Sequence, residues 1–239
     1  MKILSWDVGI INLSYCIIDF NEESKEKNII KWGIINLIEN PEMKKNMTLV
    51  FENIPKKLHE NEFLLDVDGV VIENQPSLKN PKMKSIQMVV YSYFLMYGKV
   101  LNINENKIKF IDFCNASNKL KVYKGPIILI ENLKKKKVKN NSLIMDFVEN
   151  NESEKEENNE SEKEEIKNEN KETQLKEKKK SNKLSYGDKK KMAVEHVKYF
   201  LKENNDKENL EFFELHKKKD DLADSYLQGL YIISQKFEI

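Results

Sequence analysis

Four carboxylates stand where predicted strands end or where a predicted helix begins. Asp7 closes the first apolar run of the chain, and Glu73 closes the β-branched run 69–72, so both side chains are expected to project from one edge of a sheet. Asp221 and Asp224 lie three residues apart near the start of a predicted helix and therefore face the same way. Oxygen ligands of this kind suit a divalent cation.

Each carboxylate also has a structural interpretation. An Asp at the end of a strand is commonly a turn or cap residue, and acidic residues in the first turn of a helix are favoured by the helix dipole. Asp224, however, lies deeper than a cap and is surrounded by Leu222, Ala223 and Leu227. A carboxylate in such surroundings needs a partner, and a divalent cation would serve.

The elements that must position these residues follow from the periodicity of apolar residues. Three meander strands are followed by alternating helices and strands, which predicts an α/β fold with a mixed five-stranded sheet and helices on both faces. The expected strands are 3–8, 13–20, 29–37, 69–73 and 107–113, and the expected helices are 43–60, 82–97, 187–203 and 220–236.

One segment differs in composition from the rest. Residues 150–180 contain eleven Glu and eight Lys but only two apolar residues, too few to offset the entropy of ordering. We therefore expect a charged, low-complexity insertion over 133–183, disordered or loosely helical, that divides a core made of 1–132 and 184–239.

Composition excludes several classes of protein. The 239 residues carry a net charge of +1, and all 41 basic residues are lysine. Any phosphate must therefore be bound by lysine point charges, hydroxyls or backbone N–H groups. No apolar run is long enough for a membrane span, and the first strand leaves no room for a signal or transit peptide. The two cysteines, Cys16 and Cys114, are expected to be buried free thiols.

Three motifs resemble those of the RuvC-like Holliday junction resolvases, in particular the branch of poxviruses and other large DNA viruses and its mitochondrial relatives. They occur in the family's order and spacing. The motifs are SWDVGIINLS at 5–14, IENQP at 72–76 with NPKMK at 80–84, and KKDDLADSYLQ at 218–228.

The resemblance implies an RNase H-like fold and a Mg²⁺-dependent endonuclease that resolves four-way DNA junctions by paired nicks. It implies that Asp7, Glu73, Asp221 and Asp224 bind two Mg²⁺ ions, for which Mn²⁺ would substitute. One ion would generate the attacking hydroxide and the other would stabilise the leaving 3′ oxygen.

Lysines and polar residues near the motifs have expected roles as well. By resemblance, Lys119 and Lys191 are catalytic lysines close to the scissile phosphate. The expected DNA-binding residues are Lys119, Lys121, Lys189, Lys190 and Lys191, although lysine clusters can also simply solvate a surface. Asn12, Ser14 and Gln75 could shape the site, whereas His216 is expected to be a surface histidine.

The resemblance also implies a homodimer, since a junction with twofold symmetry is most simply cut by a C2 dimer. The helix 82–97 is the candidate interface because its apolar residues are spread more widely than one core stripe requires. Those residues are Met88, Val89, Tyr93 and Met96. A fully buried core helix is the competing interpretation.

Three other functions remain open. An ATPase of the actin or sugar-kinase type also begins with Asp-x-Gly on a hairpin, but seven glycines with no Gly-Gly pair are too few for its phosphate loops. A non-catalytic nucleic-acid binder would not need all four carboxylates. Another RNase H-like nuclease, cutting flaps or RNA–DNA hybrids, is excluded less firmly. The resemblance and the composition together suggest a DNA virus replicating in the cytoplasm.

Overall fold

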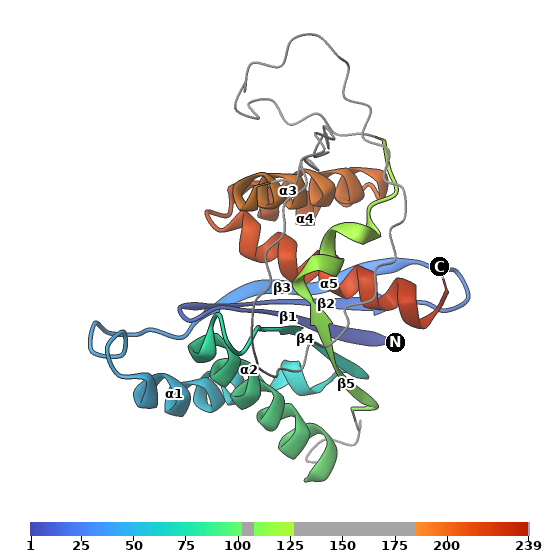
Figure 1. Cartoon of the computed structure of the whole chain (residues 1–239). Coiled ribbons are helices and arrows are strands. Elements are labelled where there is room, and N and C mark those ends of the chain that lie inside the picture. The colour runs from blue at the N-terminus through green and yellow to red at the C-terminus, as the bar shows by residue number, and fades with distance from the viewer. Residues whose placement is uncertain (102–107, 127–184, 239) are drawn as a thin grey trace, which may run out of the picture. The chain divides into compact units, whose positions relative to one another are not determined.

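A mixed five-stranded sheet organises the part of the chain that the computed structural model describes, residues 1–101, 108–126 and 185–238 (Figure 1). The strands are β1 (Lys2–Val8), β2 (Asn12–Phe20), β3 (Lys27–Asn36), β4 (Gly69–Asn74) and β5 (Phe110–Asn115). Their order is β3-β2-β1-β4-β5. The first three form an antiparallel meander, whereas β4 and β5 run parallel to β1.

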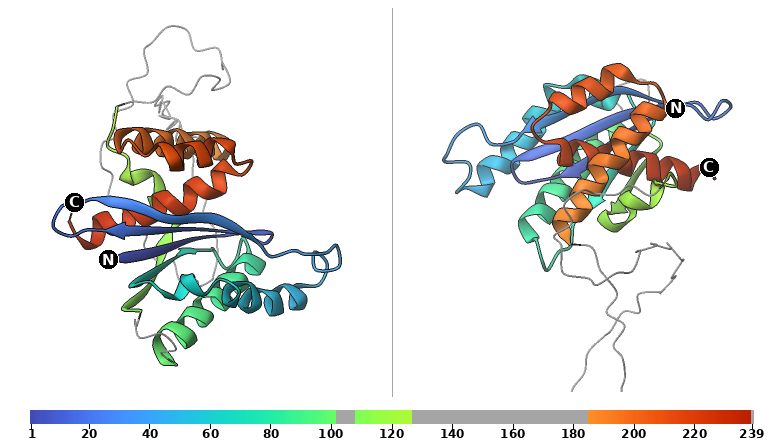
Figure 2. Two further views of the ribbon diagram at one scale, coloured as in Figure 1. Left: turned by 180° about the vertical axis from the view of Figure 1, so that it is seen from behind. Right: turned by 90° about the horizontal axis from the view of Figure 1, so that it is seen from above.

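Helices cover both faces of this sheet, as Figures 1 and 2 show. On one face lie α1 (Met47–His59) and α2 (Pro81–Phe94), which continues as a π-helical turn over Leu95–Val100. On the other face lies α5 (Lys219–Lys236), packed against β1 and β2, with α3 (Tyr186–Glu203) and α4 (Lys207–Leu215) beyond it. Short 3₁₀ helices span Glu62–Leu65 and Ala116–Val122. The predicted mixed sheet with helices on both faces is confirmed.

Alternation along the central strands builds two separate cores. Leu4 and Trp6 of β1 point toward α1 and α2, whereas Ile3 points toward α5. In β4 the same alternation places Val70 and Val71 in opposite cores. Because β4 is buried on both faces, its sequence is a continuous apolar run.

Some boundaries differ from those expected. Helix α1 begins at Met47, because Asn46 caps it by accepting a hydrogen bond from the Thr48 N–H, while Met43 is buried before the helix. Helix α4 was not predicted. Phe213 is the one buried residue of this helix, so buried apolar residues do not recur along it at a helical spacing. The sequence therefore carries little helical signal there. The predicted insertion, 133–183, lies outside the described residues.

The predicted interface helix needs one correction. Tyr93 is only 4% exposed and packs against the ring of Phe94, so it belongs to the core and cannot contribute to a surface. Met88 and Met96 are 40% and 44% exposed. The helix is therefore neither wholly an interface helix nor a fully buried core helix. One of its faces packs in the core, and another is exposed.

Two further expectations concern the thiols and the membrane. Cys16 and Cys114 are free and buried, as predicted. Within the described ranges, no helix has the length and apolar character needed to cross a bilayer.

Candidate active site

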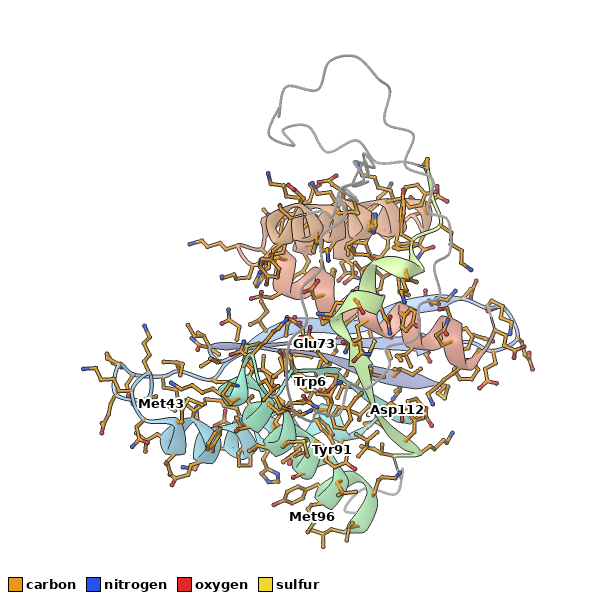
Figure 3. All side chains as sticks on the ribbon, viewed as in Figure 1. Trp6, Met43, Glu73, Tyr91, Met96 and Asp112 are labelled. Carbon is orange, nitrogen blue, oxygen red and sulfur yellow. The ribbon has the colours of Figure 1, made fainter. Side chains whose placement is uncertain are left out.

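The carboxylates of β1 and β4 come together at one edge of the sheet. Trp6 of β1 is the parallel partner of Ile72 of β4, so Asp7 and Glu73 occupy the next position on adjacent strands. Trp6 and Ile72 point into the core beneath α2, and alternation directs the two carboxylates to the opposite face. That face is the one covered by α5. Figure 3 labels Trp6 and Glu73 of this arrangement.

A buried lysine lies at the centre of the cluster. The Nζ atom of Lys119, in the 3₁₀ helix 116–122, is 2.8 Å from Asp7 Oδ1, 3.0 Å from Glu73 Oε1 and 3.1 Å from Asp224 Oδ2. Its side chain is 4% exposed. Three elements distant in sequence thus converge on one ammonium group. We call Asp7, Glu73, Asp224 and Lys119 the carboxylate cluster.

The remaining acidic residues at the start of α5 lie beside this cluster. Asp221 Oδ2 accepts a hydrogen bond of 3.3 Å from the Asn12 side-chain amide. Asp220 forms an ion pair of 2.5 Å with Lys190 of α3. Asp221 is therefore held next to the hairpin that follows Asp7, whereas Asp220 is engaged with α3.

The charges in the cluster do not balance. Three carboxylates face one ammonium, and the pKa values of Glu73 and Asp224 are raised. Burial and the nearby Asp7 raise the pKa of Glu73 to about 8, although Lys119 opposes the shift. Burial raises the pKa of Asp224 to about 6, again against the effect of Lys119. Burial and Asp220 raise the pKa of Asp221. The single positive charge of Lys119 does not offset the negative charge that these carboxylates carry when ionised.

The donor set fits a hard divalent cation. The four acidic side chains, Asp7, Glu73, Asp221 and Asp224, offer carboxylate oxygens, which Mg²⁺ and Mn²⁺ prefer over softer ligands. In the described ranges, no three acidic, histidine or cysteine side chains close on one point as metal ligands, because the Lys119 ammonium separates the carboxylates. Asp7, Glu73, Asp221 and Asp224 would hold the cation after that ammonium moves aside.

The other predicted lysines lie outside the cluster. Lys189 and Lys191 are exposed on α3, and Lys121 is exposed two residues beyond Lys119. Among the described residues, the ion pairs of the cluster involve Lys119 and none of these three. His216 ends α4, and its Nδ1 accepts a hydrogen bond from the Lys218 N–H.

Polar residues behind the carboxylates include expected and unexpected members. Gln75 donates to Glu73 Oε2 over 2.7 Å, and Ser14 is 3.1 Å from Ser225 of α5. Gln228, which donates to the Trp6 carbonyl, was not singled out from the sequence. Its position four residues after Asp224, on the same side of a helix, is the signal that was available.

The raised pKa of Glu73 predicts how stability depends on pH in the absence of metal. Folded chain binds this proton more tightly than unfolded chain, which has the ordinary value of 4.5. Stability must therefore fall as pH rises toward about 8. Burial lowers the pKa of His196 from 6.5 to about 4. The titration of His196 therefore makes stability increase with pH, but only below pH 6.5.

Between pH 6.5 and 8 we expect a loss of about 1–2 kcal/mol in the free energy of unfolding. Urea denaturation in EDTA, followed by tryptophan fluorescence, measures it. Glu73→Gln should flatten the curve. A wild-type stability that stays constant or rises across this interval contradicts the prediction.

The chain is similar in sequence to a protein of a large DNA virus. No family model matches the chain. It is 33% identical over 223 residues to an uncharacterized protein of Acanthamoeba polyphaga mimivirus. The match covers 92% of this chain but only 42% of that relative, so the chain spans less than half of the relative's length.

Solved structures match nearly the whole chain. The fowlpox virus resolvase in complex with Holliday junction DNA has a TM-score of 0.52 and 17% identity, covering 99% of both chains. The yeast mitochondrial Holliday junction resolvase has a TM-score of 0.51 and 16% identity, covering 99% of this chain and 81% of that one. The chain therefore has the RNase H-like fold of these Holliday junction resolvases.

Proposed function

We propose that the chain is a member of the Holliday junction resolvase superfamily, a Mg²⁺-dependent endonuclease that cuts four-way DNA junctions by paired symmetric nicks. The observation that carries the proposal is that Asp7, Glu73 and Asp224 surround the Lys119 ammonium at the sheet edge. The shared fold supports it.

The chemistry assigned to the residues follows from their positions. Asp7, Glu73, Asp221 and Asp224 hold the metal, and Asn12 orients Asp221. Bound Mg²⁺ supplies activation of the attacking water and stabilisation of the leaving 3′ oxygen. Lys119, which is the counter-ion of these carboxylates in the metal-free structure, would supply an ammonium point charge for the scissile phosphate. Hydrolysis leaves 5′-phosphate and 3′-hydroxyl ends.

A non-catalytic binding module explains the cluster less well. A binding surface gains nothing from enclosed carboxylates that lack sufficient positive charge, because each desolvated charge costs free energy. A nuclease gains a metal site from the same arrangement. The raised pKa values of Glu73 and Asp224 thus favour the enzyme.

The double variant Asp221→Asn/Asp224→Asn should lose junction cleavage while retaining junction binding, because neutral amides cannot replace anionic metal ligands. Cleavage is measured with Mg²⁺ on a panel of four-way junction, flap, RNA–DNA hybrid and linear duplex. The matched control is Glu211→Gln/Glu214→Gln, two exposed acids with the same spacing on α4.

Cleavage by the Asp221/Asp224 variant at the wild-type rate would overturn the assignment of these ligands. Wild-type cleavage confined to flaps or hybrids would identify another nuclease of the same fold. Junction binding without any cleavage would identify the non-catalytic module.

The DNA interface is proposed to lie on α3 and on the segment that carries Lys119. Both elements pack against α5, which brings their lysines to the same side of the sheet as the cluster. Lys121, Lys189 and Lys191 are exposed there. Lys190 forms an ion pair with Asp220. Phosphate contacts by these residues position the DNA without reading its sequence.

Neutralising one such contact has a measurable signature. Lys191→Gln should reduce the slope of log affinity against log salt by about one for junction DNA. Lys56→Gln, an exposed lysine of α1 on the other face of the sheet, should leave that slope unchanged. Equal slopes for the wild type and Lys191→Gln would remove this residue from the interface.

A second copy of the chain is the proposed partner of the open face of α2. Met88 and Met96 are exposed there, and Val100 and Leu101 continue the apolar surface beyond the helix. A twofold axis through this face would give the C2 dimer that presents two sites to a symmetric junction.

Charge on this surface should separate the copies. Met88→Glu/Met96→Glu should sediment as a monomer at micromolar concentration, because two carboxylates from each copy would face one another. It should also produce single nicks in place of paired ones. Ile30→Glu, an exposed apolar residue of β3, is the control. A monomeric wild type, or a dimeric double variant, contradicts the proposal.

The biological role proposed is resolution of branched or concatemeric genomes of a DNA virus in the host cytoplasm. The support is the mimivirus relative together with the poxvirus structure.

A further inference from the structure

Two buried glutamine side chains join the carboxylate-bearing elements to the backbone of β1. The Gln75 Nε2 atom donates to the Val8 carbonyl over 3.3 Å. The Gln228 Nε2 atom donates to the Trp6 carbonyl over 3.0 Å. Val8 and Trp6 are the residues on either side of Asp7, so both amides are anchored to main-chain carbonyls of the neighbours of this carboxylate.

Acceptor chemistry determines how each amide is oriented. A main-chain carbonyl can only accept a hydrogen bond, so the NH₂ group must be the end that faces it. Gln75 uses the same NH₂ group to bind Glu73 Oε2 over 2.7 Å. Gln228 uses it to bind Ser5 Oγ over 3.1 Å. A flip of either amide would place its carbonyl oxygen against a main-chain carbonyl oxygen, so the NH₂ end must face β1, although Gln228 Oε1 is then buried without a hydrogen-bond partner among the described residues.

The contact of Gln75 selects which oxygen of Glu73 faces the cluster. Oε2 is occupied by Gln75, while Oε1 lies 3.0 Å from Lys119 Nζ. Gln75 is itself fixed, because its backbone N–H donates to Gln87 Oε1 of α2 over 2.8 Å. A fully buried residue on the opposite face of the sheet thus secures the loop that orients Glu73.

The contact of Gln228 sets the position of α5. Asp221, Asp224 and Gln228 follow a three-then-four spacing, which places them along one side of the helix. The next residue, Gly229, allows the close approach, since a Cβ atom there would lie 2.7 Å from Ile18 Cδ1 and 3.3 Å from Ser5 Cβ. Gln228 is completely buried in this contact.

We propose that Gln75 and Gln228 are positioning residues that set the distances of Glu73 and of the α5 carboxylates from Asp7, and thereby set the affinity of the site for a divalent cation. The inference rests on the proposed function, because it assumes that these carboxylates bind metal. Gln75 binds the Val8 carbonyl and Gln228 binds the Trp6 carbonyl, so both side chains are anchored to β1, the strand that carries Asp7.

The sensitivity of metal binding to position explains why such anchors matter. Mg²⁺ demands near-octahedral geometry, with ligand distances of about 2.0–2.1 Å. Carboxylates that repel one another drift apart unless other groups hold them. Removal of a group that orients a metal ligand typically weakens affinity by about 10–100-fold.

The test measures Mn²⁺ binding to the full chain by calorimetry and by electron paramagnetic resonance, without DNA. Gln75→Met and Gln228→Met keep side-chain length but remove the donor, and each should weaken Mn²⁺ binding about 10–100-fold. Gln235→Met, at an exposed glutamine of the same helix, should bind as the wild type does. Gln228→Asn, too short to reach Trp6, replaces Gln228→Met if the latter does not fold.

A variant that is merely unstable provides the second control. Val50→Ala, at a fully buried residue of α1, should lower the melting temperature without changing Mn²⁺ affinity. The positioning role is wrong if the glutamine variants bind Mn²⁺ as tightly as the wild type. It is also wrong if Val50→Ala weakens Mn²⁺ binding as much as they do, because the loss would then reflect instability. In both cases the proposed metal site stands. If the wild type itself binds no Mn²⁺, the proposed function fails and the inference with it.

Discussion

The ammonium of Lys119, enclosed by three carboxylates, is the interaction on which the rest of the described structure depends. Its partners come from β1, β4 and α5, so it connects the first strand of the chain to the last helix. Removing one member of a buried ionic group leaves the others uncompensated, and this is far more costly than the pair itself is stabilising. The fold must therefore deliver all three carboxylates and the lysine to one place.

Polar contacts across the sheet deliver them. Apolar burial holds α5 against the sheet but is non-directional, so it does not decide where along β1 the helix stops. Hydrogen bonds do. The Trp32 indole donates to the Leu222 carbonyl over 3.1 Å, Ser14 meets Ser225, and Gln228 meets Trp6. Leu222 and Ser225 adjoin Asp221 and Asp224, and Gln228 lies four residues after Asp224, so these contacts fix the register of the two carboxylates.

The sequence predicts the sheet and the meeting of Asp7 with Glu73 well, because both follow from local rules. Alternation places each side chain on a face, and parallel strands end at a common edge. What could not be predicted depends on long-range contacts. Helix α4 has one buried residue, Tyr93 turns into the core, and the partner of Gln228 lies 222 residues away. Periodicity within a window carries none of this information.

The absence of arginine suits the geometry of the cluster. An ammonium is compact and has three donors, and three separate carboxylates each lie near the one Nζ atom. A guanidinium is larger and planar and spreads its donors over three nitrogens, so three carboxylates could not all approach one atom of it. A lysine on a flexible four-carbon stem can also leave the carboxylates when a cation arrives. In the proposed nuclease, the lysine that is the counter-ion of the metal-free fold would also supply the mobile charge for a phosphate.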